Sequence, residues 1–304
     1  MNHWRLLMMI PLLLGARLVA GADDAAALAD FKARCAAPGV LKCVGFDVDD
    51  DFSAGQVGPA ADGRVRAAMD GSVRASGAGS LRFEIPSRSP PNSSGYWLDS
   101  LGGKFGQGST FYFQFRQRFS RALLETHYQE QAGWKQFIVY QAGPSCTSVQ
   151  LVMLNQYLRG LPTLYTACGS NNLNVELPDG DHLLQQGDYR CHRRDPQPGR
   201  CAIYVADRWM TFSFQVDVGT FGKPDSRVLA WVAAEGEPLR QFIDFPGLVL
   251  DYEDSPGEGF NRIQFTPYHT DKDHRQEHPV AYTWYDELIV AWKPIAAPAA
   301  NRAR

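Results

Sequence analysis

Strict alternation of apolar and polar side chains is the feature that most limits how this chain can fold. In the segment Thr110–Phe119, one set of alternate positions is rich in phenylalanine and the other is polar: Phe111, Phe113, Phe115 and Phe119 against Tyr112, Gln114, Arg116 and Arg118. The segment Trp209–Val218 repeats the pattern. Successive side chains of a strand point to opposite faces. Each segment therefore predicts a β-strand with one buried face and one polar face.

Similar segments follow one another from Val44 to the end of the chain, separated by Gly, Pro, Asn and Asp. They predict the strands Gly45–Phe52, Val65–Met69, Ser80–Ile85, Gly95–Leu98, Thr110–Phe119, Lys135–Gln141, Val149–Tyr157, Cys201–Val205, Trp209–Val218, Arg227–Ala234, Arg240–Phe245, Arg262–Tyr268 and Ala281–Trp292. Many short strands between turn residues are typical of an antiparallel sandwich or barrel. We expect one all-β domain over residues 23–293, with a short helix at Asp23–Ala36 and a flexible tail over residues 294–304.

The first 22 residues indicate export. Arg5 ends a short polar start, Leu6–Leu14 is apolar, and Ala20 and Ala22 match a cleavage site. The apolar stretch is too short to span a bilayer, which takes about 20 residues. We therefore predict a signal peptide over residues 1–22, a secreted or periplasmic location, and no stable membrane insertion once it is cleaved.

The cysteines agree with an oxidising compartment. All six lie beyond the predicted cleavage site, and an even number in an exported chain indicates disulfides. Pairing between sequence neighbours is the simplest expectation: Cys35–Cys43, Cys146–Cys168 and Cys191–Cys201.

Charge and aromatic content bear on the class of partner. The net charge of −3 gives no support for nucleic-acid binding, which usually requires a clear basic excess. The chain has 7 Trp, 12 Tyr and 17 Phe, and aromatic residues both favour strands and stack on sugar rings. These observations favour a polysaccharide partner.

The polar faces of three predicted strands suggest where such a partner would bind. If two sheets pack face to face, these faces form an outer surface that a concave sheet would turn into a groove. The candidate binding residues on it are Gln114, Arg118, Trp209, Gln215, Arg262 and Gln264. Ordinary solvated sheet faces are polar as well, so this alternative stays open. Trp209 is equally consistent with a core tryptophan.

Metal sites are weakly indicated. The loop histidines His269, His274 and His278 do not have the spacing of a ligand helix, and we expect no cofactor. The acidic run from Asp47 to Asp51 has the oxygen ligands of a structural Ca²⁺ site. An acidic edge that deters sheet-to-sheet association would explain the same residues.

With these strands in place, the chain resembles the concanavalin A-like lectin/glucanase jelly-roll superfamily, on its polysaccharide-lyase-like side. The segments that carry the resemblance are GSLRFEIPSRSPPNSSGYW, FYFQFRQRFS, GWKQFIVYQ, RWMTFSFQVDVGTFG and AYTWYDELIVAW. The resemblance implies an antiparallel jelly-roll β-sandwich. It also implies an exported protein that acts on an acidic, uronate-containing polysaccharide by β-elimination.

The same resemblance implies the kinds of catalytic residue. In jelly-roll lyases Arg, Gln or Asn neutralises the substrate carboxylate, and Tyr or His moves the proton. Both are needed because the C5 proton is too weakly acidic until the carboxylate charge is quenched. The residues of these types here are Arg116, Gln136, Tyr268 and His269, with Tyr140 as a further substrate contact. The alginate-lyase motifs R-S/T-E-L-R, Q-I/V-H and Y-x-K-A-G are absent, so no role is transferred by motif.

Three alternatives remain beside the lyase. A retaining glucanase of this fold would need an E-x-D-x-x-E strand, which the chain lacks, so hydrolysis is the weaker enzymatic hypothesis. A non-catalytic, lectin-like module would use the same polar face. A structural envelope protein would bind no sugar at all.

Overall fold

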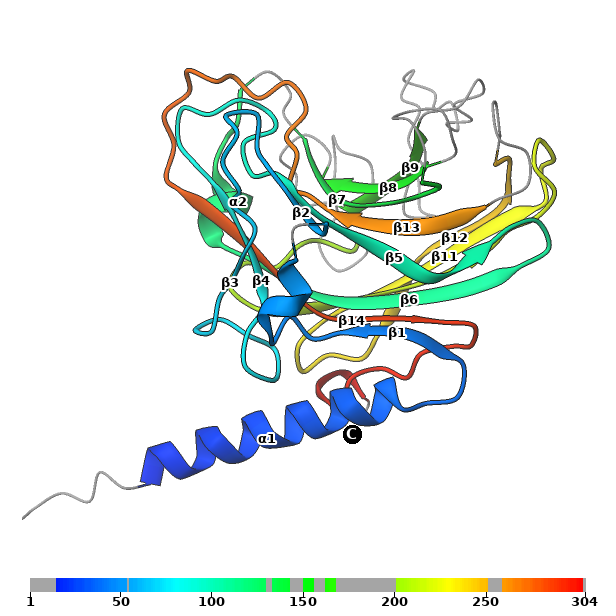
Figure 1. The fold of residues 1–304 in the computed structure, drawn as a ribbon, viewed down its shortest axis with the longest axis horizontal. Coiled ribbons are helices and arrows are strands. Elements are labelled where there is room, and N and C mark those ends of the chain that lie inside the picture. Colours follow the sequence, from blue (N-terminus) through cyan, green and yellow to red (C-terminus); the bar gives the residue numbers. More distant parts are fainter. Residues whose placement is uncertain are drawn as a thin grey trace, which may run out of the picture.

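The strands pack as two antiparallel sheets laid face to face (Figure 1). The computed structural model describes residues 15–53, 55–129, 133–142, 150–155, 162–167, 201–250 and 259–302. The larger sheet has the order β12-β11-β10-β6-β14-β4-β3, with β1 also paired to β14. Its members are β1 (Val40–Val44), β3 (Ala68–Met69), β4 (Leu81–Ile85), β6 (Thr110–Phe119), β10 (Trp209–Asp217), β11 (Ser226–Ala234), β12 (Arg240–Leu248) and β14 (Ala281–Ala291).

The smaller sheet has the order β2-β5-β13-β7-β8-β9. Its members are β2 (Val57–Gly58), β5 (Tyr96–Phe105), β13 (Phe260–Phe265), β7 (Trp134–Tyr140), β8 (Gln150–Asn155) and β9 (Pro162–Ala167). The helices are α1 (Gly15–Cys35), α2 (Arg121–Glu125) and two short 3-10 turns, η1 (Asp49–Phe52) and η2 (Ala299–Asn301). The prediction of an all-β sandwich is confirmed.

The apolar faces of β6 and β10 form the centre of the core. Phe113 lies opposite Phe214 in the ladder, and their ring centroids are 4.5 Å apart. Phe137 of β7 meets Phe113 at 5.2 Å, and Phe265 of β13 meets Phe115 at 5.0 Å. Burying one such side chain contributes about 1.5–3 kcal/mol. The alternation read from the sequence is thus the packing surface that joins the two sheets.

Most predicted strands form, with differences at their ends. The strand Thr110–Phe119 has the predicted bounds, whereas Gly45–Phe52 is wrong: a 3-10 turn occupies residues 49–52 and the strand β1 lies earlier, at Val40–Val44. Cys201–Val205 is not a strand, and β2 and β9 were not predicted. The short acidic run from Asp47 fails as a strand because Asp47 and Asp51 accept backbone hydrogen bonds from Gly79 and Asp47, respectively.

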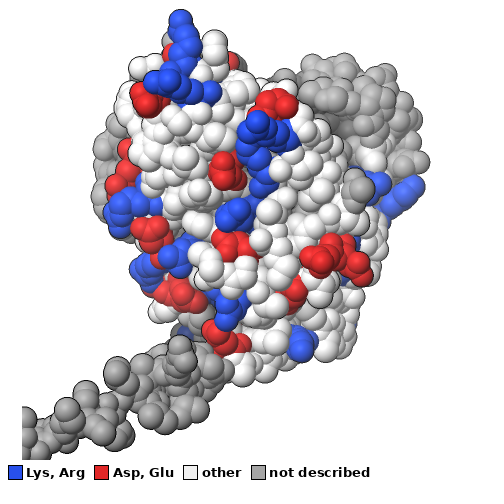
Figure 2. Space-filling view, turned by 60° about the vertical axis from the view of Figure 1, so that its left-hand side comes forward, with Lys and Arg blue, Asp and Glu red and all other residues white. Residues whose placement is uncertain are grey.

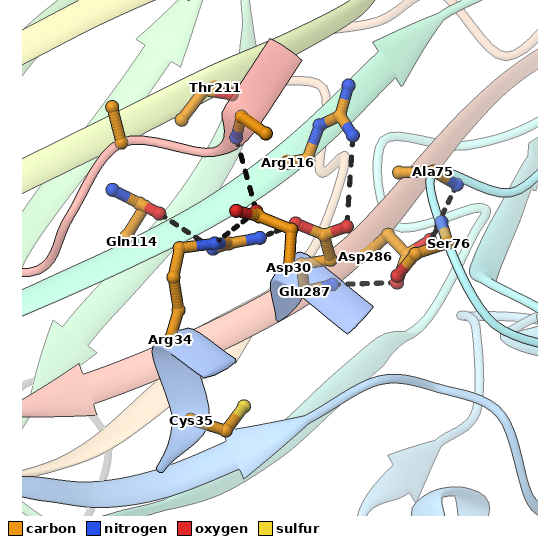
Figure 3. Close-up of polar contacts among 12 residues, drawn as sticks. Asp30, Arg34, Cys35, Ala75, Ser76, Gln114, Arg116, Thr211, Asp286 and Glu287 are labelled. Atoms are coloured by element: carbon orange, nitrogen blue, oxygen red, sulfur yellow. Dashed lines mark hydrogen bonds and ion pairs between the residues drawn. The ribbon is translucent and has the colours of Figure 1, made fainter. Parts of the chain in front are cut away.

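Helix α1 and the end of the chain lie on the outer face of the larger sheet (Figure 1). Arg34, near the end of the helix, is 4% exposed. Its guanidinium donates to Gln114 Oε1 at 3.0 Å, to Asp30 Oδ2 at 2.9 Å and to Glu287 Oε2. Figure 3 shows these groups converging between α1 and the strands. The helix is therefore held to the sheet by a buried ion pair as well as by apolar contacts.

Glu287 is presented to Arg34 by a bulge in β14. Asp286 lies opposite Arg116, but the next paired residue, Ile289, lies opposite Gln114, so the register shifts between them. Glu287 has φ 52°, in the left-handed region that L-residues rarely adopt. Asp286 accepts hydrogen bonds from the backbone of Ala75 at 2.7 Å and Ser76 at 3.3 Å. Such strain persists only where surrounding contacts impose it; here the buried charges do.

The disulfide Cys35–Cys43 is present, as predicted, and ties the end of α1 to β1. Cys201 is also disulfide-bonded, but the predicted partner Cys191 and the pair Cys146–Cys168 lie outside the described residues.

The end of the chain is docked where the sequence predicted a flexible tail. Asn301 is buried, accepts a hydrogen bond from Thr211 Oγ1 at 2.7 Å and donates to the carbonyl of Ala234 at 2.8 Å. An amide side chain that satisfies buried backbone groups explains the docking, and composition gives no sign of it.

Replacing Arg34 by methionine should destabilise the fold by about 3 kcal/mol, because it leaves the Glu287 carboxylate buried with only the more distant Arg116 beside it. The double variant Arg34→Met/Glu287→Gln should recover part of the loss. Chemical denaturation measures both.

The matched control is Arg302→Met. Arg302 also pairs with Asp30, at 2.7 Å, but it is exposed, so its loss should cost less than about 1 kcal/mol. Equal losses for the two arginine variants would contradict a stabilising role for the buried pair.

Candidate functional site

The outer face of the smaller sheet is the surface that α1 and the chain end leave uncovered. Strands β5, β13 and β7 curve so that this face is concave (Figure 1). In the ladder, Arg262 of β13 lies between Tyr140 of β7 and Ser100 of β5, and Gln264 lies between Ile138 and Leu98. Arg262, Gln264 and Tyr140 are each half-buried. A cation, an amide and a phenol thus stand side by side on one face.

A second pair stands where β7 begins. Lys135 donates its backbone N–H to the carbonyl of Tyr268 at 2.8 Å, and its Nζ lies 5.2 Å from the centroid of the Tyr268 ring. Burial lowers the pKa of Lys135 from its ordinary value. A lysine that loses its proton more readily is suited to act as a base.

Tyr140, unlike Lys135, holds its proton more tightly than usual. Burial raises the pKa of Tyr140, the charge of Arg262 lowers it in part, and Tyr96 raises it. Its phenol therefore stays protonated and can donate a hydrogen bond or a proton.

The described charged side chains on the outer face of the smaller sheet are positive. Among the described outward residues of β13, β7, β8 and Tyr96–Ser100 of β5, the charged side chains are Lys135 and Arg262. By contrast, the flank that faces the viewer in Figure 2 carries Lys and Arg interspersed with Asp and Glu. A face with cations and no carboxylate along these strands suits an anionic ligand.

The structure separates the residues that the sequence grouped together. Tyr140, Arg262, Gln264 and Tyr268 belong to the smaller sheet and its edge. Five others belong to the larger sheet, on the far side of the core: Gln114, Arg116 and Arg118 of β6, and Trp209 and Gln215 of β10. The two polar faces look in opposite directions, so they do not form one groove.

Gln114 and Arg116 are moreover covered. Both are buried, and Arg116 bonds Glu235 Oε1 at 2.6 Å and lies 3.8 Å from Glu287 Oε1. Figure 3 shows them in the ion-pair network beneath α1. Neither is placed to meet a polymer on the smaller sheet.

Gln136 lies inside the sandwich. It has no exposed surface and bonds Gln117 at 2.6 Å and Tyr204 at 2.9 Å. Its side chain therefore cannot touch a ligand on the outer face.

His269 is also enclosed. Its Nδ1 lies 2.8 Å from the carbonyl of Pro267, its ring packs 4.7 Å from that of Tyr128, and no part of it is exposed. Burial lowers the pKa of His269 to about 3, so the imidazole is neutral near pH 7. The ring of His278 also lies close to that of Tyr128, at 5.1 Å, and burial lowers the pKa of His278 as well.

Lys135 is the site residue that sequence reasoning missed. It stands at the start of a predicted strand that is otherwise mostly apolar, and such an isolated lysine is the one signal that could have been used.

No group of three or more His, Cys, Asp or Glu in the described part of the chain is arranged to hold a metal ion. Among the described helices, none is long and apolar enough to cross a membrane.

Comparison with solved structures establishes the fold. The marine PL-14 alginate lyase from Aplysia kurodai superposes with a TM-score of 0.54 at 13% identity, over 74% of this chain and 86% of that one. Alginate lyase Aly36B gives a TM-score of 0.51 at 14% identity, over 86% of this chain and 100% of that one. No protein-family model matches the chain, and no curated protein matches it. The chain therefore has the jelly-roll fold of polysaccharide lyases, as the resemblance implied.

Acid should destabilise the protein through His269. Below pH about 6.5 His269 binds a proton in the unfolded chain, whereas in the folded protein it stays neutral. The free energy of unfolding is therefore unaffected by His269 above that pH and falls by about 1.4 kcal/mol per pH unit below it. The variant His269→Gln should show a shallower fall in urea denaturation across this range. His274→Gln, on an exposed residue of the same loop, is the control and should keep the wild-type slope. Parallel slopes for wild type and His269→Gln would rule the effect out.

Proposed function

We propose that the protein is an exported polysaccharide lyase that cleaves a uronate-containing polysaccharide by β-elimination on the outer face of the smaller sheet. The observation that carries the proposal is the pair of outward-facing cations Arg262 and Lys135, with no carboxylate among the outward side chains of β13, β7, β8 and Tyr96–Ser100 of β5. A polyanionic chain would be attracted along the face, and its carboxylate groups would find a cation already in place.

Arg262 and Gln264 would bind the carboxylate of the sugar at the cleavage point. They stand two residues apart on β13 and so project from the same face. Hydrogen bonds from a guanidinium and an amide stabilise the charge that develops on the carboxylate when the C5 proton leaves.

Lys135 would remove that proton and a tyrosine would protonate the leaving oxygen. The lowered pKa of Lys135 makes the neutral amine accessible, and Tyr268 lies beside it. Tyr140, held protonated next to Arg262, is the second candidate for the acid. Of the residues expected from the sequence to be catalytic, Tyr268 keeps that role in the proposal, whereas Arg116, Gln136 and His269 do not.

Export is part of the proposal. The Cys35–Cys43 disulfide and the disulfide-bonded Cys201 support a secreted or periplasmic location, because such bonds persist in oxidising compartments. Residues 1–22 would be the signal peptide that directs the chain there, and cleavage after Ala22 would leave Asp30 and Arg34 of α1 in place.

The decisive experiment incubates the purified protein with alginate, glucuronan and glycosaminoglycans and follows the ultraviolet absorbance of unsaturated uronate ends. Arg262→Ala should lower kcat/KM by about 100-fold, the usual loss when one charge-stabilising group is removed. Arg227→Ala is the matched control, since Arg227 is an exposed arginine on β11 of the other sheet. If none of the uronate polymers gives new absorbance, and the protein migrates more slowly in a glycan-containing gel, a lectin-like module would replace the lyase as the proposed function. Inert behaviour in both assays would favour a structural envelope protein.

The rate should also depend on pH through Lys135. Only the neutral amine accepts a proton, so kcat/KM should rise with pH through a pKa below the ordinary lysine value. Lys135→Arg should abolish this limb and most of the activity, because a guanidinium stays protonated. Lys223→Arg, at an exposed loop position, should leave the profile unchanged. An unaltered limb in Lys135→Arg would exclude Lys135 as the base.

A further inference from the structure

A bulge in β7 decides which way Lys135 points. Lys135 lies opposite Leu154 of β8, but Phe137 lies opposite the very next residue, Met153, so Gln136 is an extra residue in the strand. Side chains alternate along a strand, and one extra residue reverses the faces on one side of it. Phe137 is in the core, so a regular strand would turn Lys135 inward as well. The bulge is what puts the amine on the outer face.

Gln136 is bonded at every polar group that faces the interior. Its Nε2 donates to Gln117 Oε1 at 2.6 Å, and its Oε1 accepts from the Tyr204 hydroxyl at 2.9 Å. Its backbone carbonyl accepts from the Tyr285 hydroxyl at 2.7 Å. A bulged residue loses ladder partners, and here the Tyr285 hydroxyl bonds the Gln136 carbonyl while Gln117 and Tyr204 hold its side chain.

The bonds continue across the sandwich to the larger sheet. Gln117 of β6 donates to Thr283 Oγ1 at 2.8 Å, and Thr283 in turn donates to the carbonyl of Arg118 at 2.9 Å. Gln117, Gln136 and Thr283 have no exposed surface. Burying polar groups in an apolar core is unfavourable unless every partner is present, and a fully bonded network admits one arrangement. Apolar side chains would fill this space without specifying the bulge.

We propose that Gln136 is a positioning residue, which holds the β7 bulge through Gln117, Tyr204 and Tyr285 and so keeps Lys135 on the outer face beside Tyr268. The role in catalysis rests on the proposed lyase function, whereas the orientation of Lys135 is a property of the fold. Gln136 acts only through Lys135 and contacts no substrate.

Two variants test the network. Gln136→Met keeps the size of the side chain and removes both of its hydrogen bonds, and Tyr204→Phe removes one of them in case the first variant does not fold. Ile243→Val is the control for general loss of core packing, because Ile243 is fully buried in β12 at the far edge of the larger sheet. Thermal unfolding and circular dichroism confirm that each variant is folded.

The first readout does not need activity. Reductive methylation with ¹³C-formaldehyde labels the lysines, Lys135→Arg assigns the signal, and NMR titration follows the pKa of Lys135. In wild type this pKa should lie below the ordinary lysine value, and in Gln136→Met and Tyr204→Phe it should fall further as the bulge relaxes and the amine turns toward the apolar interior. Ile243→Val should titrate like wild type.

The second readout is kinetic. With a uronate polymer that the wild type cleaves, Gln136→Met should lower kcat about tenfold or more while KM stays within about twofold, because Arg262 and Gln264 still bind the polymer and only the base is misplaced. The pH range over which the rate rises should shift together with the pKa of Lys135.

The outcomes separate the two proposals. A shifted Lys135 titration in a protein that cleaves no uronate polymer would retain the positioning role and refute the lyase function. An unchanged titration in folded Gln136→Met and Tyr204→Phe would overturn the positioning role even if the wild type is an active lyase.

Discussion

The packing of phenylalanines from β6 and β10 against β7 and β13 is the interaction on which the rest of the structure depends. Once Phe113, Phe115 and their partners are enclosed between the sheets, each sheet has one remaining face. Helix α1 and the docked chain end cover part of that face of the larger sheet, over β6, β10 and β14. Neither of them covers the concave face of the smaller sheet, and the candidate site lies there.

Buried polar groups are used in two different ways in this molecule. Beneath α1, Arg34, Glu287 and Arg116 form an ion-pair network at a strained bulge of β14, which fixes where the helix sits. Between the sheets, the neutral network of Gln136 supports the bulge of β7, which fixes where Lys135 points. In both places a bulge and its hydrogen-bond partners occur together, since a bulged strand leaves backbone groups that the ladder no longer satisfies.

The likeness to alginate lyases sets the fold and leaves the chemistry to be argued from the site. At 13% and 14% identity the shared feature is the arrangement of strands. The chemical argument rests instead on Arg262, Gln264, Lys135 and the tyrosines beside them. Their residue types meet the two demands of β-elimination, a quenched carboxylate and a base within reach of the C5 proton.

The sequence by itself determined the sandwich, most of its strands and the Cys35–Cys43 bond, because alternation and local cysteine spacing are properties of neighbouring residues. It also placed Tyr140, Arg262, Gln264 and Tyr268 among the candidates. Only the tertiary structure decided that Arg116 is buried in an ion-pair network, that Gln136 lies in the core and that Lys135 faces outward. Which strands share a sheet, which face is covered and where a bulge reverses the alternation depend on contacts between residues far apart in the chain. A period of two in one strand is the same whichever sheet that strand joins.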